Sequence, residues 1–569
     1  MSNIELANLL FEIADILEVK EVQWKPIAYR KAARSIETLS EDINEIYEKK
    51  GISGLLEISG VGKSIAQKII EYIETGRINE MQKLSSSVPE GIEELMHISG
   101  MGPKRAKLLS EKLGIKSVKE LAKACKKHKI CKLSGFGEKS EQDILLGIKL
   151  RKTGEERVLL GTILQIAREL AGHLTHPAVA KLEIAGSIRR MKETCKDIDI
   201  LIISKKPKEI MEHFTTLHEV KYVLAKGETK STVILDAGIQ ADLRVLEEKS
   251  FGAALQYFTG NKDHNVALRT IAIKKGYKLS EYGLFDKKGK YVAGRTEEEI
   301  YKKLGLQYIE PELRENTNEI QTAIAGKLPK LIPYNSIRGD LHLHTNWSDG
   351  TATTEQMILA AIKQKYEYLA ITDHSPSEHI ARGLEVKRLM RHKKEVELLQ
   401  KKYPEITIFF GSEVSILKEG KLDYPDSVLK QLDWVVASVH SGFKTTAEQM
   451  TKRIITALKN PNINALGHPT GRLLLSREPY AVNLEKVYEK AQENNLALEI
   501  NAFPSRLDLS DMNIRAAKEH KVKFVINTDA HSPDHLRYME LGVAQARRGW
   551  LEEKDVLNTL PVKKFLLRL

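Results

Sequence analysis

The chain has 569 residues, too many for one hydrophobic core, and should divide into several domains of about 100 to 200 residues. Its 89 Lys and Arg against 77 Asp and Glu give a net charge of +12, which favours a polyanionic partner but also fits ordinary surface charge. Three cysteines are too few for a disulfide framework, and no apolar stretch is long enough to span a membrane. The N-terminus is acidic and amphipathic, unlike a signal peptide. We therefore expect a soluble cytoplasmic protein.

The first 150 residues have a helical pattern and contain one short turn three times. In each copy an apolar residue and a serine precede Gly-x-Gly, and a helix is expected to follow, at Gly60 and Gly62, Gly100 and Gly102, and Gly135 and Gly137. The glycines permit a tight bend and leave N–H groups at a positive helix end, where phosphate can bind without base readout. One such turn is more often a plain connection, but three resemble helix-hairpin-helix DNA-binding elements. A structural role stays open for the third, least regular copy.

From about residue 180 the pattern changes to short β-branched runs, which predict strands at 182–185, 198–203, 231–235 and 239–246 with helices between them. Asp197 and Asp199 stand at the head of one strand on the same face, and Asp242 lies on another. Converging carboxylates repel one another unless cations neutralise them, and two Mg²⁺ ions are the usual solution. Asp-x-Asp alone is weak evidence, since it is common in solvated turns.

A phosphate-binding segment precedes these aspartates, in Gly186-Ser187-Ile188-Arg189-Arg190. Glycine allows close approach of a phosphate, Ser187 can donate a hydroxyl hydrogen bond, and arginine binds phosphate through its planar fork. Together with the aspartates, this segment predicts a nucleotidyltransferase.

Because several such motifs occur together, residues 1 to about 315 resemble the family X DNA polymerases, the group of DNA polymerase beta. The resemblance rests on the two motifs above and on Asp242-Leu-Arg244, Tyr257-Phe-Thr-Gly260, Asn265 with Arg269, Glu281-Tyr-Gly-Leu-Phe285 and the segment Leu304–Arg314. It implies that Asp197 and Asp199 hold both metal ions, and that Asp242 holds the catalytic ion and helps to activate the primer 3′-hydroxyl. It assigns the triphosphate to Ser187 and Arg190, the sugar pocket to Tyr257, Phe258 and Gly260, and the nascent base pair and template to Asn265 and Arg269. Tyr257 and Phe258 could equally be core residues.

The same resemblance suggests an N-terminal lyase with Lys68 as its Schiff-base residue. Lys25, Tyr29 and Lys31 match the phosphate pocket of that lyase, but Trp24 replaces a histidine and Ser64 a lysine. A nucleophilic lysine needs a lowered pKa, which clustered cations can supply. The loss of one neighbouring cation leaves a solvated helix lysine at least as plausible.

The last 230 or so residues contain nine candidate metal ligands, most of which follow a short apolar run expected to form a strand, at 368–372, 406–410, 434–439, 463–466 and 522–527. His342 and His344 stand two residues apart, so on a strand both reach the same face. Ligands at strand C-termini with helices between them describe the rim of a barrel, and His with carboxylate suits Zn²⁺, Mn²⁺ or Fe²⁺. Any single histidine is more often solvated. The nine are His342, His344, Asp349, His374, Glu413, His440, His468, Asp529 and His531.

Residues 336–569 resemble the PHP (polymerase and histidinol phosphatase) family, because all nine positions of that family's metal site are filled. The resemblance implies a distorted (β/α)7 barrel that hydrolyses phosphoesters with up to three ions, Mn²⁺ or Zn²⁺. The whole chain is thus expected to be multidomain: an all-α helix-hairpin-helix region, an α/β palm with a mixed sheet, a thumb, and the barrel. The expected bounds are 1–85 for an 8-kDa-like domain, 86–150 for fingers-like helices, 151–245 for the palm, 246–315 for the thumb, 316–337 for a linker and 338–569 for the PHP domain.

These features favour a bacterial or archaeal repair polymerase that fills short gaps in DNA. Its substrates would be gapped or primed DNA and dNTPs, with Mg²⁺ at the polymerase site, and we expect a monomer. The barrel would act as a 3′→5′ exonuclease, a 3′-phosphatase or an apurinic-site endonuclease. A small-molecule phosphatase fused to a nucleotidyltransferase is the alternative, and a non-enzymatic scaffold is disfavoured because every matched metal position keeps its ligand.

Overall fold

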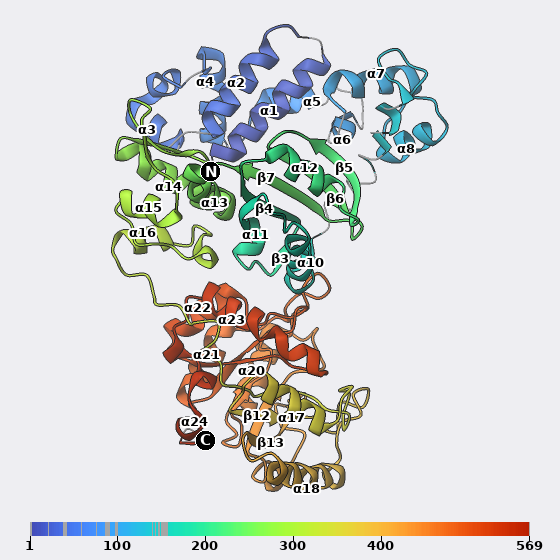
Figure 1. The fold of residues 1–569 in the computed structure, drawn as a ribbon, viewed down its shortest axis with the longest axis vertical. Helices are drawn as coiled ribbons and strands as arrows, with labels where there is room; N and C mark the ends of the chain where they lie inside the picture. Colours follow the sequence, from blue (N-terminus) through green and yellow to red (C-terminus); the bar gives the residue numbers. More distant parts are fainter. Residues whose placement is uncertain are drawn as a thin grey trace.

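The computed structural model describes residues 3–20, 22–37, 43–58, 60–75, 77–85, 92–96, 101–138, 140–142, 144, 145, 148 and 157–567. Gly100, of the second glycine turn, lies outside these ranges. An all-helical region is followed by a mixed sheet, a small antiparallel sheet and a seven-stranded parallel sheet. Figure 1 shows the N-terminal helices at one end of the molecule and the parallel sheet at the other. None of the helices in these ranges has both the length and the apolar character needed to cross a membrane.

Two apolar clusters hold the N-terminal helices together, one within residues 6–84 and one formed mainly by residues 92–148. In α4 the buried residues Ile65, Ala66, Ile69 and Tyr72 recur at helical spacing and so form one face. The helices of this region are α1 (Asn3–Val19), α2 (Lys25–Glu37), α3 (Ile43–Leu56), α4 (Lys63–Thr75), α5 (Asn79–Ser85), α6 (Ile92–Met96), α7 (Pro103–Leu113) and α8 (Val118–Lys126).

The mixed sheet has five strands in the order β2-β4-β7-β6-β5, and its only parallel pair is β4 with β7. Both faces are covered, because α10 and α12 share one apolar cluster with the sheet and α13 shares another. The elements are β1 (Val158–Leu159), α10 (Leu160–His173), β2 (Val179–Ile184), α11 (Gly186–Arg189), β3 (Thr194–Cys195), β4 (Asp197–Ser204), α12 (Pro207–Thr215), β5 (Val220–Lys226), β6 (Lys230–Leu235) and β7 (Gln240–Leu246). The sequence analysis missed β5, although this strand contains the apolar run 222–225, and most of its residues are exposed at the sheet edge.

A three-stranded antiparallel sheet in the order β10-β9-β8 follows, packed with helices around its own core. The segment 316–337, expected as a linker, is not a bare connection. It contains α16, and Ile320, Ala323 and Leu331 are buried in this core. The elements are η1 (Glu248–Ser250), α13 (Phe251–Thr259), α14 (Lys262–Lys274), β8 (Tyr277–Ser280), β9 (Gly283–Asp286), β10 (Tyr291–Ala293), α15 (Glu297–Lys303), η2 (Pro311–Leu313) and α16 (Glu319–Ile324).

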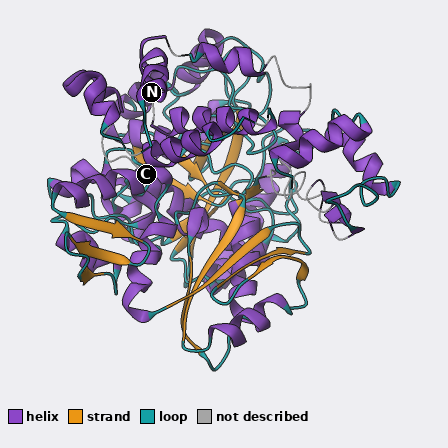
Figure 2. Cartoon of the chain, turned by 90° about the horizontal axis from the view of Figure 1, so that it is seen from above, coloured by secondary structure: helices purple, strands orange, loops and turns teal. Residues whose placement is uncertain are grey.

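Seven parallel strands, β11 to β17, lie side by side in chain order. A bridge between Leu343 and Ala530 joins the segments that follow the first and the last strand. This is the expected distorted (β/α)7 barrel, at the lower end of the molecule in Figure 1. Figure 2, which views the molecule from above, shows helices around the strands. Alternate strand residues face inward, such as Tyr368 and Ala370, or outward toward the helices, such as Leu369 and Ile371. The strands are β11 (Gly339–Asp340), β12 (Tyr368–Ile371), β13 (Thr407–Ser415), β14 (Trp434–Ser438), β15 (Ala465–Leu466), β16 (Ala497–Asn501) and β17 (Lys523–Asn527).

The barrel helices fill the connections between these strands and reach the C-terminal end of the chain. They are α17 (Thr354–Lys363), α18 (Val386–Lys402), α19 (Asp426–Leu429), α20 (Ala447–Ala457), α21 (Leu484–Glu493), α22 (Asp511–Glu519), η3 (Pro533–Tyr538), α23 (Met539–Arg548), η4 (Glu553–Asp555), η5 (Leu557–Thr559) and α24 (Val562–Leu566). Phe565 of α24 stacks on Tyr368 at 4.9 Å between ring centroids. Because Tyr368 begins β12, α24 closes the barrel at the N-terminal ends of its strands.

The barrel packs directly against the mixed sheet and its helices. Leu507, Leu541 and Ala544 belong to the same apolar cluster as the five-stranded sheet, and Trp550 belongs to the core of the three-stranded sheet. A Cβ added at Gly161 of α10 would lie 2.8 Å from Pro504. These contacts hold the two halves of the chain in a defined arrangement.

Candidate active sites

The three aspartates lie on the two parallel strands of the mixed sheet. Asp197 and Asp199 begin β4, and Asp242 on β7 is in register with Asp199. Burial and the neighbouring carboxylates raise the pKa of Asp199 to about 7, and burial with Asp242 raises the pKa of Asp197. A bound divalent cation relieves repulsion of this kind, so the carboxylates fit the expected Mg²⁺ site.

The carboxylate oxygens of the triad are nevertheless farther apart than the candidate ligand atoms of the barrel. Among the described residues, groups of ligand atoms within 4.8 Å of one another occur in the barrel but not at this triad. Asp242 is instead held by its neighbours, since Thr232 Oγ1 and Gln240 Nε2 donate hydrogen bonds to its two oxygens at 2.5 and 2.7 Å. These bonds fix the direction of the carboxylate before any ligand arrives.

Gly186 brings the expected phosphate-binding segment against the triad. Its backbone has a φ of +67°, and a Cβ at this position would lie 2.4 Å from Asp199 Oδ2. Glycine is therefore required both by the left-handed conformation and by the close approach of the carboxylate. Ser187 and Arg190 follow in and directly after the short helix α11, beside the strand that carries Asp197 and Asp199.

Arg190 is held by residues far away in the sequence. Its Nε donates to Glu315 Oε1 at 2.9 Å, and its Nη1 donates to the Thr259 carbonyl at 2.7 Å. Its Nη2 makes no hydrogen bond to any residue in the described ranges and stays available to a ligand. The positive charge of Arg190 also acts on Asp199, which places the guanidinium near the triad.

The expected sugar-pocket residues lie at the end of α13. Asn265 Nδ2 donates to the carbonyls of Tyr257 at 2.7 Å and Gly260 at 3.0 Å, and its Oδ1 accepts from Gln256 Nε2 at 2.8 Å. A Cβ at Gly260 would lie 2.5 Å from Asn265 Oδ1. The amide of Asn265 is thus used inside the protein, where it shapes the turn that carries Tyr257 and Gly260.

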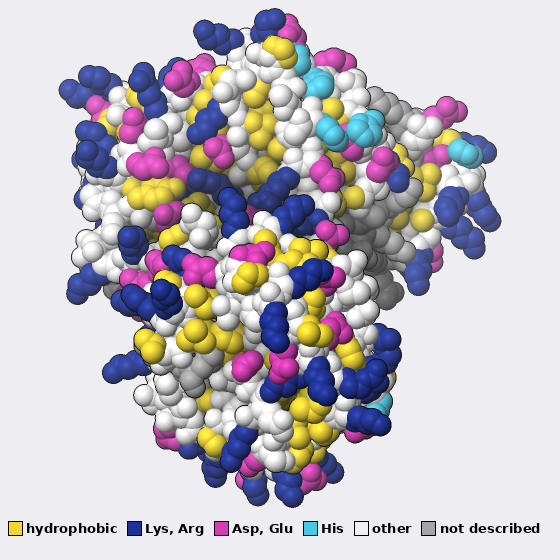
Figure 3. All heavy atoms as spheres, turned by 60° about the horizontal axis from the view of Figure 1, so that its bottom comes forward, with side chains coloured by type: hydrophobic (Ala, Val, Ile, Leu, Met, Phe, Trp, Pro, Cys, Tyr) yellow, Lys and Arg dark blue, Asp and Glu magenta, His cyan; other side chains and the backbone are white. Residues whose placement is uncertain are grey.

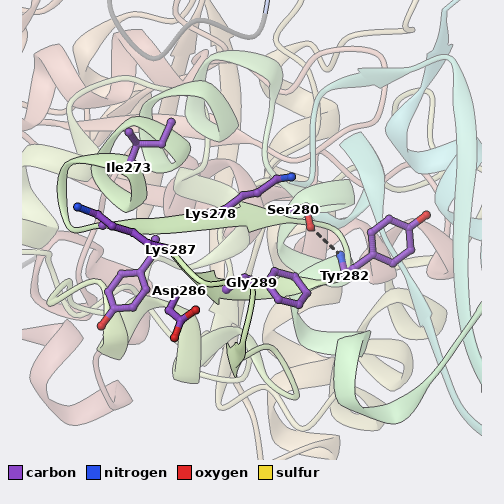
Figure 4. A pocket seen from close by; sticks show the side chains of 10 residues that line it. Ile273, Lys278, Ser280, Tyr282, Asp286, Lys287 and Gly289 are labelled. Atoms are coloured by element: carbon purple, nitrogen blue, oxygen red, sulfur yellow. Dashed lines mark hydrogen bonds between the residues drawn. The ribbon is translucent and has the colours of Figure 1, made fainter.

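One hollow opens beside this turn, and a second hollow adjoins the first. One, of about 680 Å³, lies between β7 and the three-stranded sheet and is lined by Arg244 and Phe258, whose guanidinium and ring centroid are 4.4 Å apart. The other, of about 570 Å³, lies on the β8–β9 hairpin, and Figure 4 shows the hydrogen bond between Tyr282 N and Ser280 Oγ at its edge. Neither is lined by the aspartate triad. Arg269, on α14, is half-buried.

In the barrel the nine expected ligands converge. Ligand atoms lie within 4.8 Å of one another in three overlapping groups that together include eight of them. The ninth, His468, places Nε2 at 2.9 Å from Glu413 Oε1. The groups are His344, Asp349, His374 and His531; His342, His344 and Asp529; and His374, Glu413 and His440.

The buried imidazoles of this cluster fit metal ions. Five buried ring nitrogens make no hydrogen bond within the described part of the chain: His342 Nε2, both nitrogens of His344, His374 Nδ1 and His468 Nδ1. Burying such groups without a partner is costly, and a metal ion would satisfy them. The cluster also attracts positive charge, because Glu413 and Asp349 outweigh burial and raise the pKa of His374 to about 10.

Backbone geometry at two ligands supports the same conclusion. His468 has a φ of 26° and Asp529 a φ of 54°, left-handed conformations that non-glycine residues adopt at a cost. His342 and His344 differ from expectation, because β11 ends at Asp340 and the two histidines lie on irregular chain after it. Their rings are nonetheless neighbours, with centroids 5.2 Å apart.

Glu499 is a site residue that the sequence reasoning missed. It lies on β16, fully buried, with Oε1 at 2.7 Å from His342 Nδ1 and Oε2 accepting from the His468 backbone N–H at 2.7 Å. Such a carboxylate fixes the orientation of a ligating histidine. The signal was a lone glutamate inside the apolar run Leu496–Ile500, where a charged residue needs a buried partner.

In the N-terminal region, the lyase role of Lys68 and DNA binding by the glycine turns stay predictions. Lys68 Nζ lies 2.7 Å from Glu80 Oε2, and although burial opposes it, Glu80 and Tyr29 raise the pKa of Lys68, the reverse of what a lysine nucleophile needs. Gly60 has a φ of +84° and packs on α2, while Gly102 is the N-cap of α7 with open space beside it.

Figure 3 shows Lys and Arg side chains over much of one face, including a group across its middle.

Family models match four parts of the chain. They are described as helix-hairpin-helix domain (residues 1–78), SAM-like helix-hairpin-helix tandem (92–150), DNA polymerase beta thumb (254–315) and PHP domain (340–503).

Three curated proteins are similar over different spans. DNA polymerase/3'-5' exonuclease PolX of Bacillus subtilis (strain 168) is 39% identical over 566 residues, 98% of both chains. A probable phosphatase of Thermoanaerobacter sp. (strain X514) is 33% identical over 232 residues, 39% of this chain and 89% of that protein. DNA polymerase lambda of Rattus norvegicus is 25% identical over 342 residues, 55% of this chain and 56% of that protein.

Proposed function

Because this chain belongs to the family X DNA polymerases that carry a PHP domain, we propose that its mixed sheet adds nucleotides to a DNA 3′ end and its barrel removes them in the 3′→5′ direction. The observation that carries this proposal is the presence of two separate sites in one chain. One is a carboxylate triad beside the turn at Gly186, and the other is a cluster of nine candidate metal ligands.

For nucleotide addition, Mg²⁺ held by Asp197, Asp199 and Asp242 would neutralise phosphate charge and activate the primer 3′-hydroxyl. Gly186 lets the triphosphate approach, the Ser187 hydroxyl donates to it, and Arg190 binds it through the free Nη2. Tyr257, Phe258 and Gly260 border the sugar. Asn265 acts by shaping their turn, and Arg269 faces the nascent base pair.

For hydrolysis, Mn²⁺ or Zn²⁺ held by the nine barrel ligands would activate water and offset the charge of the phosphodiester. Asp349 and His531 are the most exposed of the ligands, at 32% and 29% of their side chains, so the DNA end reaches the cluster from their side. Glu499 holds His342 in place. A free 3′ end, a 3′-phosphate and an apurinic site all offer the phosphoester that such a cluster cleaves.

The physiological substrate we propose is a short gap in duplex DNA, filled during repair in the cytoplasm. Gly60, Gly62, Gly100 and Gly102 would bind the DNA backbone through their N–H groups. We propose the domain bounds given above, with residues 316–337 folded in part onto the thumb, and a monomeric enzyme.

The test uses a labelled gapped duplex with and without nucleotides, in Mg²⁺ and in Mn²⁺. Asp242→Ala should abolish nucleotide addition and keep exonuclease activity, and His344→Ala should do the reverse. If each folded variant loses both activities, the assignment of one reaction to each site is wrong.

A second candidate is a small-molecule phosphatase activity of the barrel. It is favoured by the similarity to the probable phosphatase, 89% of which aligns with 39% of this chain. An amino-alcohol or sugar phosphate assayed beside a 3′-phosphorylated primer distinguishes the two, since release of phosphate from the small molecule alone would support this candidate.

A further inference from the structure

The barrel reaches into the polymerase site through one buried arginine, Arg548, at the end of α23. Its side chain is 1% exposed. Figure 1 shows α22 and α23 on the side of the barrel that faces α11 and α16. A buried guanidinium is costly unless its donors are paired, so its partners define its role.

Arg548 contacts both the backbone and the side-chain partner of Arg190. Its Nη1 donates to the Arg190 carbonyl at 2.9 Å and to Glu315 Oε1 at 3.2 Å. Its Nη2 donates to Asp511 of α22, which anchors it to the barrel.

Glu315 in turn joins this arginine to the nucleotide site. Its Oε1 also accepts from Arg190 Nε at 2.9 Å, and its Oε2 accepts from Asn261 Nδ2 at 3.0 Å. One carboxylate oxygen is therefore shared by two guanidinium groups, one from each half of the molecule. Moving either arginine changes the position of the other.

We propose that Arg548 is a positioning residue for nucleotide addition: the barrel holds Arg190 in its triphosphate-binding orientation through Glu315 and the Arg190 carbonyl. This inference rests on the proposed role of Arg190 in triphosphate binding. Arg548 touches neither substrate nor metal ligand, so it affects the affinity for the incoming nucleotide and leaves hydrolysis at the barrel unchanged.

The neighbouring residue supplies a matched control. Arg547 is also an interdomain arginine at the end of α23, with Nε bonded to Glu312 Oε1 at 2.7 Å and Nη1 to the Ile332 carbonyl at 2.9 Å. It contacts neither Arg190 nor Glu315 within the described residues. A loss of general interface stability should appear equally in Arg547→Ala and Arg548→Ala.

The experiment measures KM for dNTP and kcat on a gapped duplex with the full chain, together with exonuclease rate and thermal midpoint. We expect Arg548→Ala to raise KM by roughly three- to thirty-fold with little change in kcat or exonuclease rate. Arg548→Lys should fall between Arg548→Ala and wild type, and Arg547→Ala should keep the wild-type KM. Glu315→Gln, which leaves the barrel sequence intact, should raise KM even if Arg548→Ala folds poorly.

The double variant decides whether Arg548 acts through Arg190. In an Arg190→Ala background, Arg548→Ala should raise KM by less than about twofold, because the residue it positions is gone. The inference is overturned if the two effects multiply, or if Arg547→Ala raises KM as much as Arg548→Ala. If Arg190→Ala alone leaves KM unchanged, the proposed triphosphate role of Arg190 fails instead.

Discussion

At the scale of single residues, both sites depend on groups that only one residue type can supply. Gly186 leaves no room for a Cβ because Asp199 Oδ2 would lie 2.4 Å from it. The buried imidazoles of the barrel leave ring nitrogens without hydrogen bonds among the described residues, which suits metal ligation and little else. At each candidate site, the space and the hydrogen bonding around the residue therefore fit the residue type found there.

Gly186→Ala should reduce nucleotide addition by roughly a hundredfold or more, because displacing Asp199 by an ångström misplaces the reacting groups. Exonuclease activity should stay unchanged. Gly172→Ala is the control, since a Cβ at Gly172 of α10 meets nothing within 4 Å. Primer-extension rates measure the effect, and equal activity of the two variants would contradict the proposed close packing.

A buried carboxylate in the thumb gives a pH-dependent contribution to stability. Glu297 accepts hydrogen bonds from Arg189 at 2.9 and 2.7 Å and from Arg314, and although burial opposes it, these arginines lower the pKa of Glu297 from 4.5 to about 2. A lowered pKa stabilises the folded state above pH 4.5, and the contribution is lost as pH falls toward 2. The shift corresponds to about 3 kcal/mol.

Glu297→Gln should therefore lower the free energy of unfolding by about 3 kcal/mol at pH 7, and the difference from wild type should shrink between pH 4.5 and pH 2. Urea unfolding at several pH values measures it. A difference that stays constant over this range would show that the ion pair contributes no pH-dependent stability.

At the scale of elements, the metal cluster depends on closure of the barrel at the opposite end. Phe565 of α24 is 1% exposed and packs on Tyr368, Phe409 and Trp434, with ring centroids 4.9 to 5.7 Å away. These side chains fill the bottom of the barrel, so the strands that carry the ligands above them keep their spacing.

Phe565→Ala should lower barrel stability by about 3 to 5 kcal/mol through the cavity it leaves. Exonuclease activity should then be lost at a lower temperature than in wild type. Leu566→Ala, on the same helix but at a side chain that is 49% exposed, should behave as wild type. If both variants lose activity at the wild-type temperature, α24 does not support the barrel.

At the scale of the whole molecule, the two halves share cores as well as ion pairs. Leu541 of α23 is 4% exposed and belongs to the apolar cluster of the mixed sheet. Arg168 of α10 pairs with Glu540, and Arg472 donates to Glu193. Such an interface should make the sheet and the barrel unfold together.

In the wild-type protein, nucleotide addition and exonuclease activity should be lost at the same temperature on heating. In Leu541→Asp the two heat-inactivation curves should separate, because a buried unpaired charge breaks the shared core. Nucleotide addition and exonuclease activity are measured after heating at a series of temperatures. Leu359→Asp, at an exposed leucine of α17, should keep the curves together. Separate curves in the wild-type protein would contradict shared unfolding.

The amino-acid sequence determined the chemistry and most of the architecture. The apolar runs marked five of the seven barrel strands through the candidate ligands that follow them, and the Asp and Gly-Ser motifs marked the candidate polymerase site. This was possible because strand periodicity and ligand type are local properties. The edge strand β5, whose apolar run 222–225 leads to no site residue, and the short helix α16 within the expected linker were not predicted.

The tertiary structure alone decided which distant residues meet. Glu499 joins His342, Glu315 joins Arg190, and Arg548 crosses from the barrel to both Arg190 and Glu315. No spacing in the chain encodes these contacts, because each partner is separated by more than a hundred residues and brought near only by packing of the cores. The sequence thus determined what each site can bind, and the packing of the two halves decided how they are held together.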